Sequence, residues 1–310
     1  MGDECNATYI TLGGHIEVHT YRFLYFGIML AIYIVILCSN STIIGLIWIH
    51  KNLHDPMYIF IAALLLNSIL YSSTIYPKLL IDFLSEKQSI TYPICLFQCF
   101  LYYSLNGAEF LLLSAMAYDR YVSICKPLQY QIIMRKSTVS ILLFLAWVVP
   151  ACHIAGAHAL TINNKLCSFT LRGVYCNNSV NSLYCRKTAI MSIYGVVILF
   201  NVGILPILFI LFTYTKILVI AYRSCGEVKK KAIQTCLPHL LVLINLSSLF
   251  TSDVILVRVQ SDFPETAHVV LTLQIIIYNP LCNPLIYGLK MNKVSKHLKQ
   301  LFCRNKVVIV

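Results

Sequence analysis

The sequence predicts an all-α membrane protein, a seven-transmembrane helix bundle with a short amphipathic eighth helix. Three observations support this fold class. Of the 310 residues, 58% are hydrophobic and only 12% are charged, whereas soluble domains carry about 25% charged residues. Seven apolar stretches are long enough to cross a bilayer, which takes about 20 residues. Basic residues gather in alternate connections between these stretches, as the positive-inside rule requires.

The seven stretches fill most of the chain and leave no room for a separate soluble domain. They divide it into an extracellular amino terminus over residues 1–23, a seven-transmembrane domain over 24–289, and a cytoplasmic amphipathic helix and tail over 290–310. The predicted spans are Leu24–Ile49, Met57–Leu80, Cys95–Tyr118, Val139–Thr161, Ala189–Ile220, Cys236–Val257 and Ala267–Leu289.

The net charge of +12 invites a nucleic-acid partner, but the placement of the charges argues against one. Sixteen of the 24 Lys and Arg are Lys51 or lie in residues 120–136, 216–231 and 290–306. These segments mark the cytoplasmic side, and membrane lipid is their predicted partner. Residues 1–23 carry three acidic residues and one basic residue, so we predict that they lie outside.

Sequons and cysteines fit this orientation. Asn6 is a predicted glycosylation site, and Asn177 in an outer loop is a second candidate. The four cysteines on the outer side predict two disulfides with three alternative pairings. A zinc site is the alternative, but eight residues between neighbouring loop cysteines are too many for the usual ligand spacing. The four are Cys95 at the start of span three and Cys167, Cys176 and Cys185 in one loop.

Polar side chains at membrane depth form two candidate sites. Glu109 must hold a cation, pair with a base or take up a proton, and no span offers a basic residue at its depth, so sodium or a proton is predicted. In the outer half of span three, Tyr102, Tyr103 and Asn106 suggest a small-molecule pocket, with ordinary core packing as the alternative. Arg258 near the outer end of span six either binds a charged group of the ligand or anchors the helix at the membrane surface.

The inner end of span three carries Asp119 and Arg120 where the helix meets water. In hydrocarbon a central Arg or Asp costs roughly 2.5–3.5 kcal/mol, so the pair is either a boundary anchor or part of a switch. Asn283 beside Pro284, with Tyr287 one turn on, predicts a hinge in span seven. On a chain with seven spans, the two motifs together favour the switch.

The tail predicts a basic amphipathic helix on the inner leaflet. Between Met291 and Phe302 the apolar residues share one face and the lysines the other. Cys303 at its end is a palmitoylation candidate. Nothing indicates an enzyme: His153 and His158 in span four have no metal-ligand partners at suitable spacing, and no reactive group at depth has a base beside it.

These motifs together resemble the olfactory receptor family of rhodopsin-like class A G-protein-coupled receptors, over nearly the whole chain. The matching blocks are Leu53–Tyr58, Met116–Tyr121, Ile124–Leu128, Lys231–Leu240 and Asn283–Tyr287. Two further segments, Pro56–Ala62 and Tyr76–Leu80, look like the fish-type branch.

The resemblance implies disulfides Cys95–Cys176 and Cys167–Cys185. It also exposes a departure, because Ser68 stands where the family usually has an aspartate in span two. We therefore expect a weakened sodium site at Glu109, or a neutral, protonated Glu109 bonded to Ser68 or Asn67. No other cofactor or metal is predicted.

The resemblance further implies an odorant receptor that binds small odorants in the outer half of the bundle. It would activate a stimulatory, olfactory-type heterotrimeric G protein and raise cyclic AMP, from the plasma membrane of olfactory cilia. The alternative is a class A receptor for an endogenous metabolite outside the olfactory system. The predicted ligand contacts are Tyr102, Tyr103, Asn106, Ile198, Val202, Phe250, Val254 and Arg258. The predicted switch and G-protein-coupling residues are Asp119, Arg120, Tyr121, Tyr214, Lys231, His239, Asn283, Pro284 and Tyr287.

Overall fold

A computed structural model describes residues 8–14, 21–162, 164–171, 173–186, 189–222, 226–258 and 265–304. For residues 226–235, 253–258, 265–269, 289–290, 292 and 301–304 only the backbone is described. Asn6 lies outside the described residues, as do the side chains of Lys231, Val254, Arg258 and Cys303.

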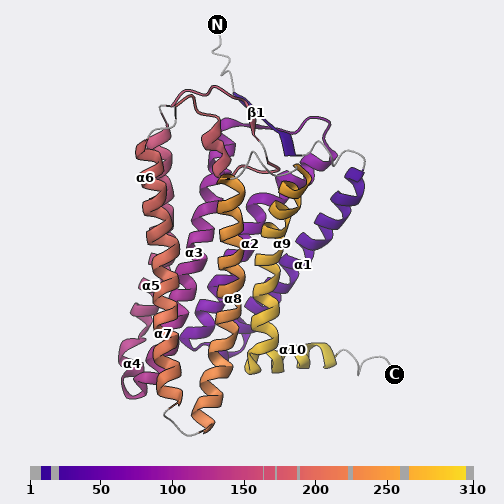
Figure 1. The fold of residues 1–310 in the computed structure, drawn as a ribbon. Helices are drawn as coiled ribbons and strands as arrows, with labels where there is room; N and C mark the ends of the chain where they lie inside the picture. Colours follow the sequence, from indigo (N-terminus) through magenta and orange to yellow (C-terminus); the bar gives the residue numbers. More distant parts are fainter. Residues whose placement is uncertain are drawn as a thin grey trace, which may run out of the picture.

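Seven long helical segments of the described chain run side by side in one bundle, with α10 turning away at the inner end (Figure 1). The predicted fold class is confirmed, and the helices extend up to ten residues beyond the predicted spans. The segments are α1 (Arg22–Ile49), α2 (Pro56–Leu84), α3 (Tyr92–Cys125), α5 (Lys136–Thr161), the fifth span in three pieces, α8 (Gly226–Arg258), α9 (Glu265–Lys290) and α10 (Asn292–Arg304).

The fifth span is interrupted by a π-helical segment, a form of interruption that the sequence did not predict. Its pieces are α6 (Ala189–Ile198), a π-helical segment η5 (Leu199–Ile204) and α7 (Leu205–Tyr222). Pro206 is the second residue after the π segment. Because proline has no N–H to donate to the preceding turn, a wider turn before it relieves the missing bond. Short helices complete the inner and outer loops: η2 (Lys51–Leu53), η3 (Pro127–Gln129), α4 (Tyr130–Ile133) and η4 (Asn178–Ser182).

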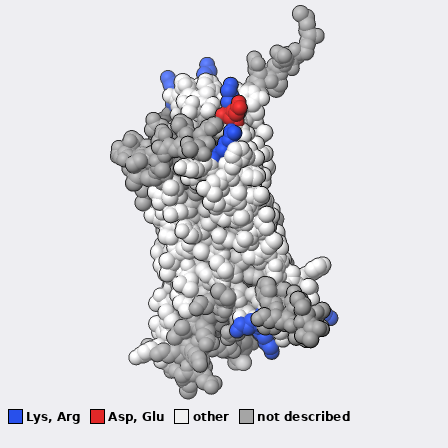
Figure 2. Space-filling view, turned by 90° about the vertical axis from the view of Figure 1, so that its right-hand side faces the viewer, with Lys and Arg blue, Asp and Glu red and all other residues white. Residues whose placement is uncertain are grey.

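The apolar lengths fit a membrane protein. Within the described residues, five segments are long and apolar enough to cross a bilayer: Arg22–Ile49, Pro56–Leu84, Lys136–Thr161, Ala189–Tyr222 and Val270–Gly288. α8 adds the shorter apolar stretch Cys236–Ser252. α3 is more polar, but its Gln98, Asn106 and Glu109 are buried inside the bundle. On the face drawn in Figure 2, charged side chains lie near the two ends, with an uncharged band between.

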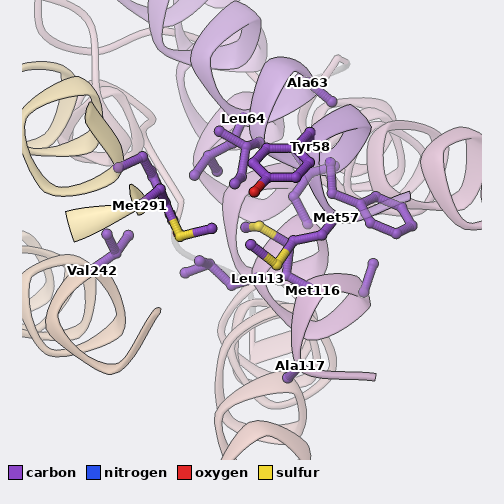
Figure 3. Packing of buried hydrophobic residues seen from close by; sticks show 14 of the residues in the cluster. Met57, Tyr58, Ala63, Leu64, Leu113, Met116, Ala117, Val242 and Met291 are labelled. Atoms are coloured by element: carbon purple, nitrogen blue, oxygen red, sulfur yellow. The ribbon is translucent and has the colours of Figure 1, made fainter. Parts of the chain in front are cut away.

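The largest buried cluster lies in the inner half and joins α2, α3, α8 and α9. Met57, Met116 and Met291 bring their flexible side chains together there, beside Leu113 and Val242 (Figure 3). Unbranched methionine fills irregular gaps between helices. This cluster packs the inner ends of the helices against one another.

A three-stranded sheet covers part of the outer end, which the sequence did not predict. Its order is β2 (Ser89–Thr91), β1 (Tyr9–Leu12), β3 (Thr170–Leu171), with β1 antiparallel to β2 and parallel to β3. The inward side chains Ile10, Leu12 and Leu171 pack with the Cys95–Cys176 disulfide. The sheet therefore ties three distant segments of the chain to α3.

Candidate functional site

A cavity of about 680 Å³ lies in the outer half, between α3, α5, α6, η5 and the loop around η4. Its volume falls in the range of pockets that hold small organic molecules. Five residues that the sequence predicted as ligand contacts line it. They are Tyr103, Asn106, Ile198, Val202 and Phe250.

Tyr102, predicted as a sixth pocket residue, lies outside this cavity. It is fully buried, its ring packs against those of Tyr71 and Tyr175, and its hydroxyl accepts from the Tyr175 hydroxyl at 3.1 Å. It lines a separate void of about 10 Å³ with Asn106 and Phe250, which suits about one water molecule. Adjacent helix residues point about 100° apart, so Tyr103 faces the cavity while Tyr102 faces the core.

The described walls of the cavity carry no acidic side chain and no lysine or arginine. His158, for which the sequence suggested no functional role, lines the cavity, as do Thr161, Ser192 and Tyr194. Such walls suit an uncharged molecule with one or two hydrogen-bonding groups.

Gly107 sets the floor of the cavity, and sequence reasoning missed it. A Cβ at this position would lie 2.5 Å from Val202 Cγ1 and 2.8 Å from Pro150 Cβ. Glycine therefore lets α3, α5 and η5 meet closely beneath the cavity. A glycine inside an apolar stretch was the only signal in the sequence.

The outer loop is fixed to α3 by covalent and polar contacts. Disulfides join Cys95 to Cys176 and Cys167 to Cys185, which confirms the pairing that the resemblance implied. The amide of Cys176 donates to Gln98 Oε1 at 3.0 Å. The Asn178 amide donates to the Tyr103 hydroxyl at 3.0 Å.

The second sequon is not offered to a glycan, so that prediction was wrong. Asn177 is 4% exposed, and its Oδ1 accepts from the Ser179 amide at 3.0 Å, capping η4. Spacing alone could not reveal this, because the sequon motif says nothing about burial.

Buried amides surround Glu109 in mid-membrane. Asn279 Nδ2 donates to Oε2 at 2.5 Å, and Asn283 Nδ2 donates to Oε1 at 2.6 Å and to Ser68 Oγ at 2.9 Å. Asn67, predicted as a neighbour, lies elsewhere: it donates to the Leu105 carbonyl and accepts from Trp147. The sequence missed Asn279, one turn before the Asn283 motif.

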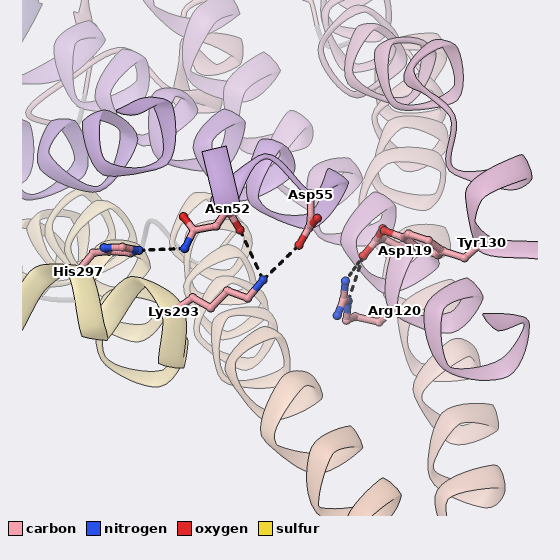
Figure 4. Close-up of polar contacts among 7 residues, drawn as sticks. All are labelled: Asn52, Asp55, Asp119, Arg120, Tyr130, Lys293 and His297. Atoms are coloured by element: carbon pink, nitrogen blue, oxygen red, sulfur yellow. Dashed lines mark hydrogen bonds and ion pairs between the residues drawn. The ribbon is translucent and has the colours of Figure 1, made fainter. Parts of the chain in front are cut away.

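The predicted switch pair exists as a buried contact at the inner end of α3. Arg120 Nε donates to Asp119 Oδ2 at 3.0 Å, and Arg120 Nη2 donates to the same oxygen. Tyr130 of α4 donates to Asp119 Oδ1 at 2.8 Å (Figure 4). Burial and the Asp119 carboxylate raise the pKa of Tyr130, so its phenol keeps the proton it donates.

Asn283 of the predicted switch set bonds to Glu109, whereas other members of the set lie in the inner core. Tyr287 is fully buried, and its hydroxyl contacts His239 Nδ1 at 3.2 Å. The Tyr214 hydroxyl is buried and has no hydrogen-bond partner among the described residues. Tyr121 packs against the inner cluster, and Pro284 sits within α9.

A second ion pair, at the inner surface, joins α10 to the first inner loop. Lys293 Nζ lies 3.4 Å from Asp55 Oδ2, and His297 Nε2 lies 3.3 Å from Asn52 Nδ2 (Figure 4). Both Lys293 and Asp55 are more than half exposed. Water therefore screens this pair far more than the pair at Arg120.

A sequence model of the olfactory receptor family matches residues 29–305. The chain belongs to the olfactory receptor family. It is similar to the olfactory receptor-like protein OLF4 of Canis lupus familiaris, with 33% identity over 288 residues and 91% of each chain. It is also similar to the Homo sapiens olfactory receptors 2A5 (31% identity, 90% of this chain and 91% of the relative) and 2A12 (32%, 98% and 99%). Members of this family are receptors and not enzymes.

Proposed function

We propose that this chain is an odorant receptor that binds small odorants in the outer cavity and activates a stimulatory, olfactory-type G protein. One observation carries the proposal: the single helix α3 lines the cavity with Tyr103 and Asn106 and bears the buried Asp119–Arg120 pair at its inner end. A receptor for an endogenous metabolite is not favoured, because the relatives named above are olfactory receptors.

The odorant contacts Tyr103, Asn106, Ile198, Val202 and Phe250, which line the cavity. Tyr102 acts behind this wall by holding Tyr175 and the loop in place. Val254 and Arg258 stay as predicted contacts near the outer end of α8.

Signalling requires that the odorant bind the active arrangement better than the resting one. In the resting arrangement Arg120 pairs with Asp119. On activation Arg120 leaves this carboxylate for the hydroxyls of Tyr214 and Tyr287, and α8 pivots at its inner end. The buried Tyr214 hydroxyl, which has no hydrogen-bond partner among the described residues, supports this exchange. The cleft formed holds the G protein, with Lys231 and His239 beside it, and cyclic AMP rises.

The chain lies in the plasma membrane of olfactory cilia with its amino terminus outside, where Asn6 carries a glycan. The basic α10 rests on the lipid of the inner leaflet. The predicted palmitoyl group at Cys303 would strengthen that attachment.

Glu109 forms a weak sodium site or holds a proton. A hard cation prefers oxygen ligands, and it would find them in the carboxylate, in Ser68 Oγ and, once the two amides turn, in the oxygens of Asn279 and Asn283. Both amide oxygens are buried without a hydrogen-bond partner among the described residues, while the amide nitrogens bond to Glu109. Because Ser68 replaces a second carboxylate, binding is weak. Ser68→Asp should make signalling more sensitive to sodium; unchanged sensitivity would refute this role for Glu109.

The switch is tested in cells that express the chain with an olfactory-type stimulatory G protein, by measuring cyclic AMP against a panel of odorants. Arg120→Ala should abolish the response at unchanged surface expression. Arg135→Ala is the matched control, since Arg135 is an exposed arginine just before α5 and should signal normally. Full signalling by Arg120→Ala would reject the switch.

A further inference from the structure

The cavity reaches the outer surface of the bundle between α5 and α6. Six consecutive residues of α6, Met191–Val196, all line it. A helix has 3.6 residues per turn, so six consecutive residues point in every direction around its axis. The space they line must therefore continue past the edge of α6.

Exposure of the lining side chains supports this opening. Ile193 and Val196 on α6 are 63% and 55% exposed, and Leu160 on α5 is 45% exposed, yet all three line the cavity. Both helices belong to segments apolar enough to cross a bilayer. The opening therefore faces lipid hydrocarbon.

Two polar contacts mark the ends of this opening. At its inner end His153 of α5 contacts Asn201 of η5, at 3.4 Å between Nε2 and Nδ2. At its outer end Asn164 Nδ2 lies 3.5 Å from Met191 Sδ. We call the stretch between these two contacts the α5–α6 seam.

Tyr194 narrows the seam. Its hydroxyl lies so near Gly156 of α5 that a Cβ on that glycine would overlap it. The next residue, Gly195, has open space where a side chain would be. A single aromatic ring resting on bare backbone thus narrows the passage between the cavity and the lipid.

We propose that neutral, apolar odorants enter sideways from the bilayer, through the α5–α6 seam, when the Tyr194 ring swings away. This inference rests on the proposed function. Each CH₂ buried in the membrane favours partitioning by about 0.8 kcal/mol, so the bilayer concentrates such molecules at the seam. A charged molecule would be excluded from this route by its cost in hydrocarbon, and the uncharged cavity walls match that selection.

The extracellular route is the alternative. On that side the wall is Asn178–Ser182, and the Cys95–Cys176 disulfide and Tyr103 hold this segment to α3. Entry there would require the anchored loop to lift.

Cys99 provides a readout that needs no known odorant. Its thiol lines the cavity and is buried, whereas Cys152 lies exposed on α5 and reports how much reagent the membrane holds. The full-length receptor in membranes is treated with N-benzylmaleimide, which is neutral and apolar. Mass spectrometry then gives the ratio of the labelling rates at Cys99 and Cys152.

Ile193→Trp should block the seam and lower this ratio about tenfold, equivalent to a barrier about 1.4 kcal/mol higher. Ile190→Trp is the matched control, because Ile190 is equally exposed on α6 (64%) but does not line the cavity. Tyr194→Ala should raise the ratio several-fold, and Tyr194→Phe, which keeps the ring, should leave it unchanged.

Entry from water would give the opposite pattern. If Ser182→Trp in the loop slowed labelling while Ile193→Trp did not, the lateral entrance would be rejected. Equal ratios in Ile193→Trp, Ile190→Trp and the unmodified chain would reject it as well. If the variants gave the expected labelling ratios but no odorant raised cyclic AMP in the unmodified receptor, the lateral entrance would be supported and the proposed function rejected.

Discussion

The two halves of the fifth span differ in packing although both are apolar. α6 buries none of its ten residues, whereas α7 buries Pro206, Ile210, Thr213, Tyr214, Ile217 and Ala221. The outer half leaves space for a small molecule, and the inner half joins the core that holds the switch. One helix thus serves recognition at one end and transmission at the other.

The joint between these halves is η5 together with Gly107. Val202 and Gly203 of η5 are buried, and the absent side chain at Gly107 lets α3 approach Val202 and Pro150. Packing is therefore tight at the level where the cavity ends. A shift of α6 by a bound molecule would reach α7 through this contact.

Different contacts stabilise the outer and inner halves of the whole bundle. The outer half relies on two disulfides, a small sheet and side-chain bonds to loop backbone. The inner half relies on the large apolar cluster in Figure 3 and one buried ion pair. Disrupting each kind of contact should therefore affect one half more than the other.

The largest effect should come from the disulfide between α3 and the loop. Replacing Cys95 and Cys176 by alanine opens a connection of 81 residues, while replacing Cys167 and Cys185 opens one of 18. Loop entropy gives losses of about 4.5 and about 3 kcal/mol in unfolding free energy. Thermal unfolding of the purified receptor should rank the two variants in this order.

Hydrogen exchange on the same variants tests whether the outer and inner halves of the bundle are stabilised separately. Loss of Cys95–Cys176 should speed exchange in the outer loop and α6 while α7 stays protected. Equal loss of protection in α6 and α7 would show that the halves unfold as one unit.

Most spans were predictable because they are apolar stretches whose length the bilayer fixes, and α3 was found although it carries buried polar residues. The outer sheet was not, since its strands have only two to four residues and pair across long separations, such as Thr11 with Thr170. The π segment was also hidden, because Pro206 predicts a disturbed helix without saying how it is resolved.

Within the site, residue type was easier to predict than direction. Tyr102 and Tyr103 are identical in chemistry, but one faces the core and the other the cavity. Asn67 was grouped with Glu109 from adjacency to Ser68, yet it bonds to Leu105 and Trp147. Side-chain direction depends on helix rotation, which packing sets.

A smaller effect should follow from removing the buried ion pair of the inner half. Asp119→Asn removes the charge that holds Arg120, and charge-assisted hydrogen bonds contribute about 1.5–3 kcal/mol. Cyclic AMP without odorant should rise, at matched surface expression, because the resting arrangement loses its main polar contact. The apparent affinity for odorants should rise as well, because odorants bind the active arrangement better than the resting one.

Asp55→Asn is the matched control for this change. Asp55 also pairs with a cation at the inner end, but it is 62% exposed, and exposed pairs contribute little. Its basal cyclic AMP should stay at the level of the unmodified receptor. If Asp55→Asn activated as much as Asp119→Asn, burial of the pair would not be what holds the resting state.

The smallest effect separates two glycines that both line the cavity. Gly107→Ala places a Cβ 2.8 Å from the rigid ring of Pro150, and overpacking of this kind costs about 1–3 kcal/mol. Gly195→Ala meets nothing within 4 Å and gains up to about 1 kcal/mol of helix propensity. Gly107→Ala should thus lower the thermal midpoint of the receptor, whereas Gly195→Ala should leave it equal or raise it. If both variants were destabilised alike, α6 would be as tightly packed as the joint, and the contrast between the two halves of the fifth span would be wrong.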